Sequence, residues 1–291
     1  MQIVYHLGAH ATDGDRMLKT LLNNRAALFE RRTEIVTPNR HRGIFEEALM
    51  ALNGGQATPE MEQIMLDAIL DSDDPQRVIC SSPGFLGPTS RVVSAEGLYP
   101  GAANRVAALR NLFPQADSEF FIAIRNPATL IAEMIQSEQG ADYARMTGSP
   151  DPRKLSWLPA MQAIAQAAQR RRLVVWCHED VPLVWPDVVR LVAGLPSDSG
   201  LSGGLLYMHE LLGDQGLARL RQALAGRDQM TIATRRQVYA ERLAADALPG
   251  VLDQVIDLPG WSQETVDVVT RRYRDEVSQI AVLPGVEFIL P

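Results

Sequence analysis

The chain has 291 residues, of which 46% are hydrophobic and 22% charged, and its formal net charge is −7. This balance is ordinary for a soluble globular protein. No stretch approaches the roughly 18 apolar residues of a membrane span, and the acidic charge argues against a general nucleic-acid binder, which needs a basic face. The N-terminus lacks a basic region followed by an apolar signal segment, so a cytoplasmic location is expected.

Five apolar runs predict the strands of a mainly parallel sheet, because the apolar spacing between them changes to a helical period. Helix starts are also readable. Thr58 before Pro59 predicts one helix N-terminus, and Asn126 before Pro127 predicts another directly after a strand. This alternation therefore predicts a three-layer α/β fold in which helices flank a five-stranded sheet. The strands are expected over residues 2–8, 34–37, 77–81, 119–125 and 173–177.

Strand signals fade beyond residue 194. Residues 195–215 are rich in Gly and Ser and predict a mobile loop. The chain is expected to be one domain over residues 1–291, with a core over about 1–195 and a helical C-terminal extension over 216–291. That extension is predicted to hold helices over about 215–225, 230–246 and 262–281.

An apolar stripe on the last of these helices bears on self-association. Val266, Val269, Tyr273 and Val277 recur at helical spacing. The stripe fits a homodimer contact and core burial equally well, so a homodimer stays an open expectation.

The two cysteines, Cys80 and Cys177, each end a strand-like run and lie far apart in the sequence. This spacing suggests neither a disulfide framework nor a zinc knuckle, and we expect buried free thiols. His6 and His10 are four residues apart, but a strand-to-loop geometry does not place them on one helical face. No metal site is predicted.

The most informative segment is HLGAHATDGD over residues 6–15, where an apolar strand breaks into a glycine-containing loop and then opens a helix. Amides of such a loop and of the first helical turn have no internal partners, so a phosphate or sulfate group can accept from them. The positive end of the helix dipole assists. The residues expected to bind this group are Gly8, Ala9, His10, Thr12, Gly14, Asp15 and Arg16.

Three segments, in the same order, resemble the bacterial sulfotransferase-like proteins of the P-loop fold, which use 3′-phosphoadenylyl sulfate. Residues 6–15 resemble their first loop, typically H-x-G-x-x-K-T-G-T-T, which grips the 5′-phosphosulfate. IRNP over residues 124–127 resembles their R-[DN]-P element, whose arginine, here Arg125, binds the 3′-phosphate. VVWCHEDV over residues 174–181 resembles their Y-E-D-L strand end, and a helix ending in L-x-G-L follows at residues 191–195.

Each of these segments ends a strand, where the ligands of open α/β sheets bind. The resemblance implies a P-loop-type fold and transfer of a sulfuryl group from 3′-phosphoadenylyl sulfate to an acceptor hydroxyl or amine, with no metal. The acceptor, a small molecule, saccharide or peptide, is not fixed. The reaction needs a base near the acceptor oxygen, for which His10 in the loop is the catalytic candidate and His41 an alternative.

Several positions depart from the family pattern. Ala11 stands at the loop lysine, and Asp13 and Asp15 stand where Gly-Thr-Thr is typical. Pro83 stands where an acid often ends the third strand, and Glu133 where a serine is expected. The departures favour two alternatives: a non-catalytic binding or scaffold protein that kept the fold and lost donor binding, or a transferase acting on another anionic ligand.

Structural explanations exist for the departures. Thr12 or Asp13 can cap the following helix, and Asp15 suits its first turn. The lost positive charge could come instead from Arg16 or Lys19. At the second element, Ser137 could replace the missing hydroxyl, while Arg125 could be an ion-pair partner of Glu133 or Asp117.

Overall fold

The computed structural model describes residues 1–291 apart from 138–142, 144–147, 149–150, 226–229 and 254–255. Within the described residues, six parallel strands form a sheet in the order β2-β3-β1-β6-β7-β8. A short antiparallel pair, β4 with β5, lies outside it. The strands are β1 Gln2–His6, β2 Thr33–Val36, β3 Arg77–Ser81, β4 Val93–Ser94, β5 Gly97–Leu98, β6 Asp117–Ile124, β7 Arg172–Cys177 and β8 Val286–Ile289.

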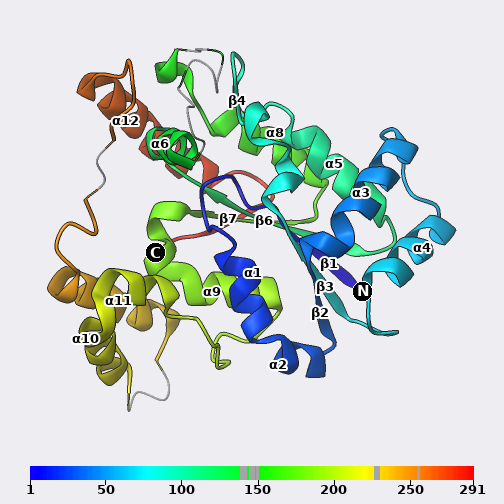
Figure 1. Ribbon diagram of the computed structural model, residues 1–291, viewed down its shortest axis with the longest axis horizontal. Coiled ribbons are helices and arrows are strands. Elements are labelled where there is room, and N and C mark those ends of the chain that lie inside the picture. The colour runs from blue at the N-terminus through cyan, green and yellow to red at the C-terminus, as the bar shows by residue number, and fades with distance from the viewer. Residues whose placement is uncertain (138–142, 144–147, 149–150, 226–229, 254–255) are drawn as a thin grey trace.

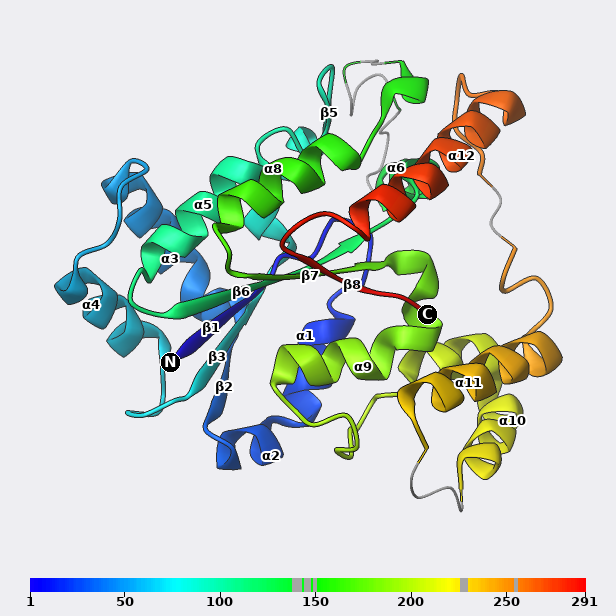
Figure 2. The same ribbon diagram turned by 180° about the vertical axis from the view of Figure 1, so that it is seen from behind.

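Helices cover both faces of the sheet, as Figures 1 and 2 show from opposite sides. One layer holds α3 Pro38–Leu52, α4 Pro59–Ile69, α5 Ala102–Leu112, α6 Pro127–Ser137, α8 Leu158–Ala168 and α12 Gln263–Ile280. The other holds α1 Arg16–Asn23, α2 Arg25–Glu30 and α9 Val181–Ala193, with α10 Leu206–Leu224 and α11 Ile232–Asp246 beside α9. Short 3₁₀ turns are η1 Pro83–Leu86, η2 Thr89–Arg91, η3 Pro152–Lys154 and η4 His178–Asp180.

Strand side chains alternate between these layers, which explains the uninterrupted apolar runs in the sequence. Tyr5 of β1 packs in the core beneath α3, α5 and α8, whereas its neighbour Val4 packs against α1 and α9. A strand buried on both faces needs apolar residues at every position. The three-layer α/β prediction is confirmed. The five predicted strands match five of the six strands in the central sheet.

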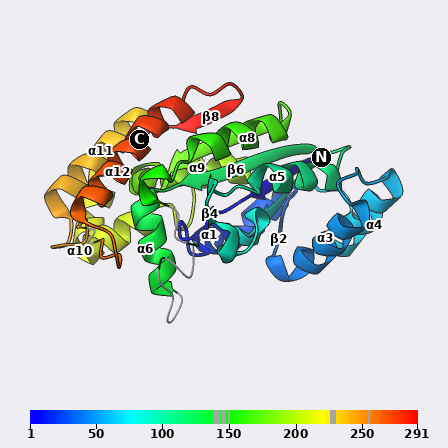
Figure 3. The same ribbon diagram turned by 90° about the horizontal axis from the view of Figure 1, so that it is seen from above.

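Two predictions for the C-terminal third need correction. Residues 206–215, expected as loop, belong to α10, and the chain returns to the sheet as β8, which pairs with β7. Figure 3 shows α10, α11 and α12 gathered at the end of the molecule opposite α3 and α4. None of the described helices is long and apolar enough to cross a membrane.

The apolar stripe of α12 is covered by the chain itself. Val266 and Val269 pack with Ala128 of α6, and Tyr273 belongs to the main core. This burial removes the stripe as a surface for self-association.

Helix α4 begins as predicted, because the Thr58 hydroxyl accepts a hydrogen bond from the Met61 amide at 3.3 Å.

Both cysteines are free and buried, as expected. Burial raises the pKa of Cys80, and it raises the pKa of Cys177 to about 12. Neither thiol is therefore ionised at neutral pH, which fits a packing role.

Candidate anion site at the end of the central strands

The loop after β1 lies at the carboxyl edge of the sheet, between the ends of β3 and β6. Its first amide, that of Leu7, donates to the Phe121 carbonyl of β6 at 2.9 Å. Gly8 then adopts φ +50°, a left-handed conformation, beside the backbone of Pro83 after β3. An L side chain at residue 8 would be strained in this conformation, so glycine lets the chain turn at this point.

Ala11 also has a positive φ, of 53°. This conformation is uncommon for a residue with a side chain and persists where the surroundings fix it. Here the Ala11 carbonyl accepts a hydrogen bond from Arg125 Nη1, and the Thr12 hydroxyl donates to the Ala9 carbonyl at 2.6 Å. Thr12 therefore closes the loop rather than capping α1.

Asp13 caps α1. Its carboxylate accepts from the Met17 amide at 3.0 Å, and its carbonyl accepts from the Arg16 amide at 3.0 Å. A carboxylate therefore occupies part of the helix N-terminus, where an anionic ligand would also accept. Asp15 precedes α1 in a left-handed conformation, with an exposed side chain that makes no capping bond. Lys19 is likewise exposed.

Arg16 reaches from the start of α1 toward α10. It pairs with Glu210 at 3.0 Å, and its guanidinium lies 5.2 Å from the centre of the Tyr207 ring. Tyr207 is buried, and burial together with the charge of Asp13 raises its pKa. Helix α10 thus brings an aromatic ring and an acid against the loop.

Arg125 follows β6 and is buried. Its Nε donates to the Thr129 hydroxyl at 3.1 Å, and its Nη2 lies 3.8 Å from a Glu133 oxygen. Burial lowers the pKa of this guanidinium, and the charges of Glu133 and Glu179 oppose that change. The proposed ion pair with Glu133 is thus present, whereas Asp117 pairs with an arginine before β7 instead.

Ser137 lies at the end of α6, and its hydroxyl donates to the Met134 carbonyl of the same helix at 2.8 Å. At this position it makes no hydrogen bond to Arg125 or the loop within the described residues.

His10 is held by Tyr99. The Tyr99 hydroxyl accepts from the His10 amide at 2.8 Å and lies 3.0 Å from His10 Nδ1. With its oxygen engaged, the hydroxyl can donate its proton to Nδ1, which leaves the ring hydrogen on Nε2. Burial lowers the pKa of His10, so its ring is neutral at pH 7, and with the ring hydrogen on Nε2 it presents a donor beyond the loop.

Three buried polar atoms around the loop have no hydrogen-bond partner among the described residues: His6 Nε2, His178 Nδ1 and Tyr207 Oη. His6 is fixed through Nδ1 to the Ser81 hydroxyl at 2.8 Å. Burial lowers its pKa, against the charge of Asp13. Burial and the charges of Arg125 and Arg16 lower the pKa of His178 to about 3.

The structure therefore brings together the first-loop residues, Arg16, Arg125 and the strand end at residues 177–180. Glu179 links two of these segments, because it accepts from the Asn126 amide at 2.8 Å and from the Tyr273 hydroxyl at 2.8 Å. The sequence alone did not identify His178 or Tyr207 as site residues. The strand-end motif contained His178, but no pattern placed Tyr207 near the loop.

His41 lies apart from this cluster. It is buried between Phe45 and Phe85, with ring centres 5.1 and 5.2 Å away, and neither ring nitrogen has a partner among the described residues. Burial and the charge of Arg42 lower its pKa to about 4. This aromatic setting is that of a packed side chain.

The described part of the chain contains no group of three or more side chains suited to hold a metal ion. In comparisons with known proteins, no family model and no curated protein matched this sequence.

Proposed function

We propose that the loop after β1 binds the phosphosulfate end of 3′-phosphoadenylyl sulfate and that the chain transfers its sulfuryl group to an acceptor. One observation carries the proposal: His6 Nε2, His178 Nδ1 and Tyr207 Oη are buried around the loop without partners in the described structure. Buried polar atoms almost always have a hydrogen-bond partner. Three such atoms at one strand edge point to a polar ligand.

The donors at this site suit an oxyanion. Tyr207 can donate its hydroxyl hydrogen. His6 and His178 stay neutral at pH 7 because burial lowers their pKa values, and the single ring N–H of His6 lies on Nε2 when the Ser81 hydroxyl donates to Nδ1. Arg16 and Arg125 supply positive charge from two sides. The amides of Gly8 and Gly14 also find no acceptor among the described residues.

In the transfer, the donor supplies an activated sulfuryl group, so that a bond from the acceptor oxygen or nitrogen to sulfur forms while the bond from sulfur to the bridging phosphate oxygen breaks. The residues of the chain stabilise the negative charge of the reacting groups. Arg16 and Arg125 offset the charge of the leaving bisphosphate, and His10 Nε2–H can donate to an equatorial oxygen. The acceptor's proton needs another group, since His10 in this tautomer is not a base.

A groove of about 1050 Å³ beside η1 could hold the acceptor. Gly84 lines it, directly after the Pro83 that packs on Gly8, and three arginines contribute to its wall. Glu46 and Glu96 line it as well, so the groove favours an acceptor with several polar groups. Its arginines are Arg42, Arg91 and Arg105.

One specific observation favours a second function, that of a non-catalytic binding or scaffold protein. The Asp13 carboxylate already accepts from the Met17 amide at the helix N-terminus. A phosphate about 4 Å from this carboxylate would be opposed by about 4 kcal/mol at an effective dielectric of 20. Arg16 and Arg125 are moreover paired with Glu210 and Glu133. In this interpretation, carboxylates of the chain itself pair with the groups that would otherwise bind the donor's phosphates.

Thermal unfolding with adenosine 3′,5′-bisphosphate separates the two functions. A ligand at about 100 times its Kd stabilises the fold by roughly 2.7 kcal/mol, which is readily measured. We expect Arg125→Ala to weaken binding about tenfold or more, because it removes a charged donor. Arg171→Ala, which deletes the same charge before β7, serves as the matched control.

If millimolar bisphosphate leaves the melting temperature unchanged, the sulfotransferase proposal fails and the scaffold interpretation stands. If binding occurs but Arg125→Ala and Arg171→Ala bind equally well, the assigned phosphate contact is wrong.

A further inference from the structure

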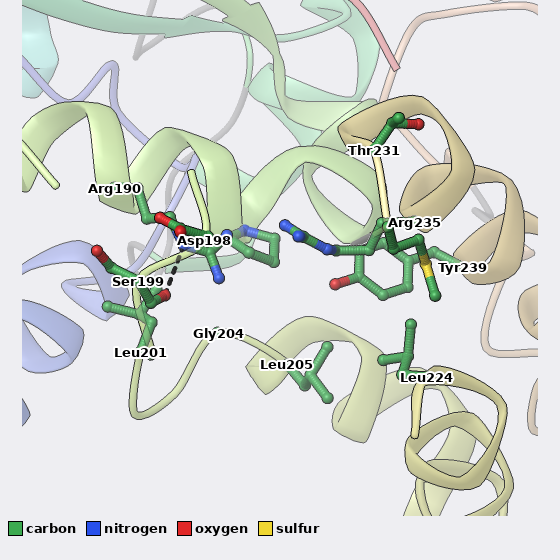
Figure 4. A pocket seen from close by; sticks show the side chains of 13 residues that line it. Arg190, Asp198, Ser199, Leu201, Gly204, Leu205, Leu224, Thr231, Arg235 and Tyr239 are labelled. Carbon is green, nitrogen blue, oxygen red and sulfur yellow. Dashed lines mark hydrogen bonds between the residues drawn. The ribbon is translucent and has the colours of Figure 1, made fainter. Parts of the chain in front are cut away.

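A second cavity, of about 580 Å³, lies between α9, α10, α11 and the segment over residues 198–205. None of its lining residues belongs to the loop site. Figure 4 shows Arg235 extending from α11 into the cavity toward Arg190 on α9. Two guanidinium groups from different helices thus line one solvent-open cavity.

The positive charge of this cavity exceeds what the nearby acid can balance. Asp187 of α9 is buried, and one of its oxygens lies 2.8 Å from Arg236 Nη2 and 2.9 Å from Arg236 Nε. Its other oxygen lies 3.6 Å from Arg190 and 4.0 Å from Arg235, both outside good hydrogen-bond distance. Asp187 is therefore committed to Arg236, and Asp198 is the one acid lining the cavity.

Arg190 shows the consequence of this arrangement. Its Nη1 is buried, lies 3.6 Å from an Asp187 oxygen and makes no hydrogen bond within the described residues, while its Nε donates to the Ser199 carbonyl at 3.0 Å. Burial lowers the pKa of this guanidinium, and the neighbouring charge of Arg235 lowers it further. Arg235 itself makes a 3.3 Å hydrogen bond to the Ser197 carbonyl. Arg190 and Arg235 thus share one Asp187 oxygen that lies beyond hydrogen-bond distance of both, so an anion in the cavity would complete the pairing of their charge.

The rest of the wall combines aliphatic side chains with the phenol of Tyr239 and the hydroxyl groups of Ser199 and Thr231. Tyr239 of α11 points into the cavity beside Arg235, and aliphatic side chains lie along the opposite side (Figure 4). Cavities of this size with apolar walls and few polar groups are typical of small-molecule sites. The apolar residues are Leu201, Leu205, Leu224 and Met230.

We propose that this cavity binds a small molecule with an apolar body and a carboxylate head. Guanidinium groups bind carboxylates through paired N–H donors, and an arginine on each side of the cavity provides such donors. Leucine and methionine side chains would cover the apolar body. This binding is independent of the nucleotide site at the loop.

Octanoate is the probe, with octanol as its uncharged analogue, and isothermal titration on the full chain is the measurement. Octanoate binds and octanol binds much more weakly. Arg235→Gln lowers octanoate affinity about tenfold or more, as loss of a charged donor should. Arg221→Gln removes an exposed arginine of α10 outside the cavity and leaves affinity unchanged.

A second variant keeps both arginines in place. Leu201→Trp fills the cavity and abolishes octanoate binding without loss of charge. Equal binding of octanoate and octanol, unchanged affinity in Arg235→Gln or Leu201→Trp, or tighter binding of octyl phosphate than octanoate would each overturn the carboxylate assignment. No binding of octanoate at millimolar concentration would mean that the arginines only anchor residues 197–199.

Discussion

At the scale of single residues, Asp13 decides how the loop should be interpreted. Its carboxylate stabilises α1 by accepting from the Met17 amide, and it also places negative charge where a phosphate would sit. Stability and anion binding therefore depend on this residue in opposite directions. Sequence reasoning anticipated the cap, but it could not show that the same carboxylate faces His6 and Tyr207.

Asp13→Asn should lower stability and raise affinity for adenosine 3′,5′-bisphosphate. Asparagine keeps an oxygen that can accept from the Met17 amide, so only the negative charge at the helix N-terminus is lost, at a cost of about 0.3–1 kcal/mol of unfolding free energy, whereas loss of the repulsion strengthens binding. Urea unfolding and calorimetric titration measure the two effects. Asp15→Asn is the control, because the Asp15 side chain is exposed and makes no capping bond, and both quantities should stay near wild type. Unchanged affinity in Asp13→Asn would show that this carboxylate does not oppose the ligand.

His41 makes the free energy of unfolding depend on pH. The unfolded chain binds a proton at a histidine near pH 6.5, whereas folded His41 does so only near pH 4. Its contribution to stability is therefore complete above about pH 6.5 and is lost as the pH falls from there toward 4. Folded His178, with a pKa of about 3, acts in the same direction.

His41→Phe should reduce the loss of unfolding free energy between pH 7 and pH 4.5 by about 1–2 kcal/mol, since the variant has no group to protonate there. The new ring can pack on Phe45 and Phe85, so stability at pH 7 should change little. Urea unfolding at both pH values tests this, with exposed His209→Gln as the control. An equal acid loss in wild type and His41→Phe would remove His41 as the cause.

At the scale of elements, Arg77 connects β3 to its neighbours. Its guanidinium contacts Glu119 of β6 at 2.6 Å, Gln2 of β1 at 2.6 Å and the Val192 carbonyl of α9 at 2.9 Å. The side chains of Arg77 and Glu119 are each only 7% exposed. Removing one partner of a buried pair leaves an uncompensated charge, which costs more than the pair itself contributes.

Arg77→Met should therefore destabilise the protein by about 3–5 kcal/mol, and Arg77→Met combined with Glu119→Leu should recover much of that loss. A double-mutant cycle by urea unfolding measures the coupling. If the two single costs simply add, the pair is not coupled and this account of the sheet is wrong. Arg172, 3.7 Å from Glu119, balances part of the Glu119 charge in Arg77→Met alone.

The elements that the sequence predicted are those with strong local signals. Each of the five predicted strands contains a buried apolar run, and these runs identified the strands in the sequence. Strand β8 has only four residues at the edge of the sheet, with one fully buried position. The sequence does not predict the start of α10, because that start directly follows a run rich in Gly and Ser over residues 197–204. Gly213, with φ 63°, also interrupts the helix.

At the scale of the whole molecule, the candidate site depends on contacts between distant segments. The loop, Arg125 and the strand end after β7 lie at neighbouring strand ends, which a parallel topology makes predictable. Tyr207 and Glu210 come instead from α10, nearly two hundred positions beyond the loop, and reach it only because the C-terminal helices fold back against α9. No local pattern encodes that packing.

The same packing explains why the C-terminal helices divide into two roles. Helix α12 packs on α6 and α8 in the layer of the main core, whereas α10 and α11 form a smaller apolar cluster of their own beside α9. Helix α12 extends the main core. Helices α10 and α11 line the cavity that holds the two arginines, and α10 brings Tyr207 to the loop.

The central claim is that a phosphate or sulfate group binds among the buried polar atoms at the loop that have no hydrogen-bond partner in the described part of the chain. Nitrogen-15 NMR of the histidine rings tests it most directly, because the chain has five histidines, and His→Gln variants assign their signals. On addition of adenosine 3′,5′-bisphosphate, the ring signals of His6 and His178 should shift, while those of His41 and His209 stay in place. Saturating ligand with no shift at His6 or His178 would contradict the claim.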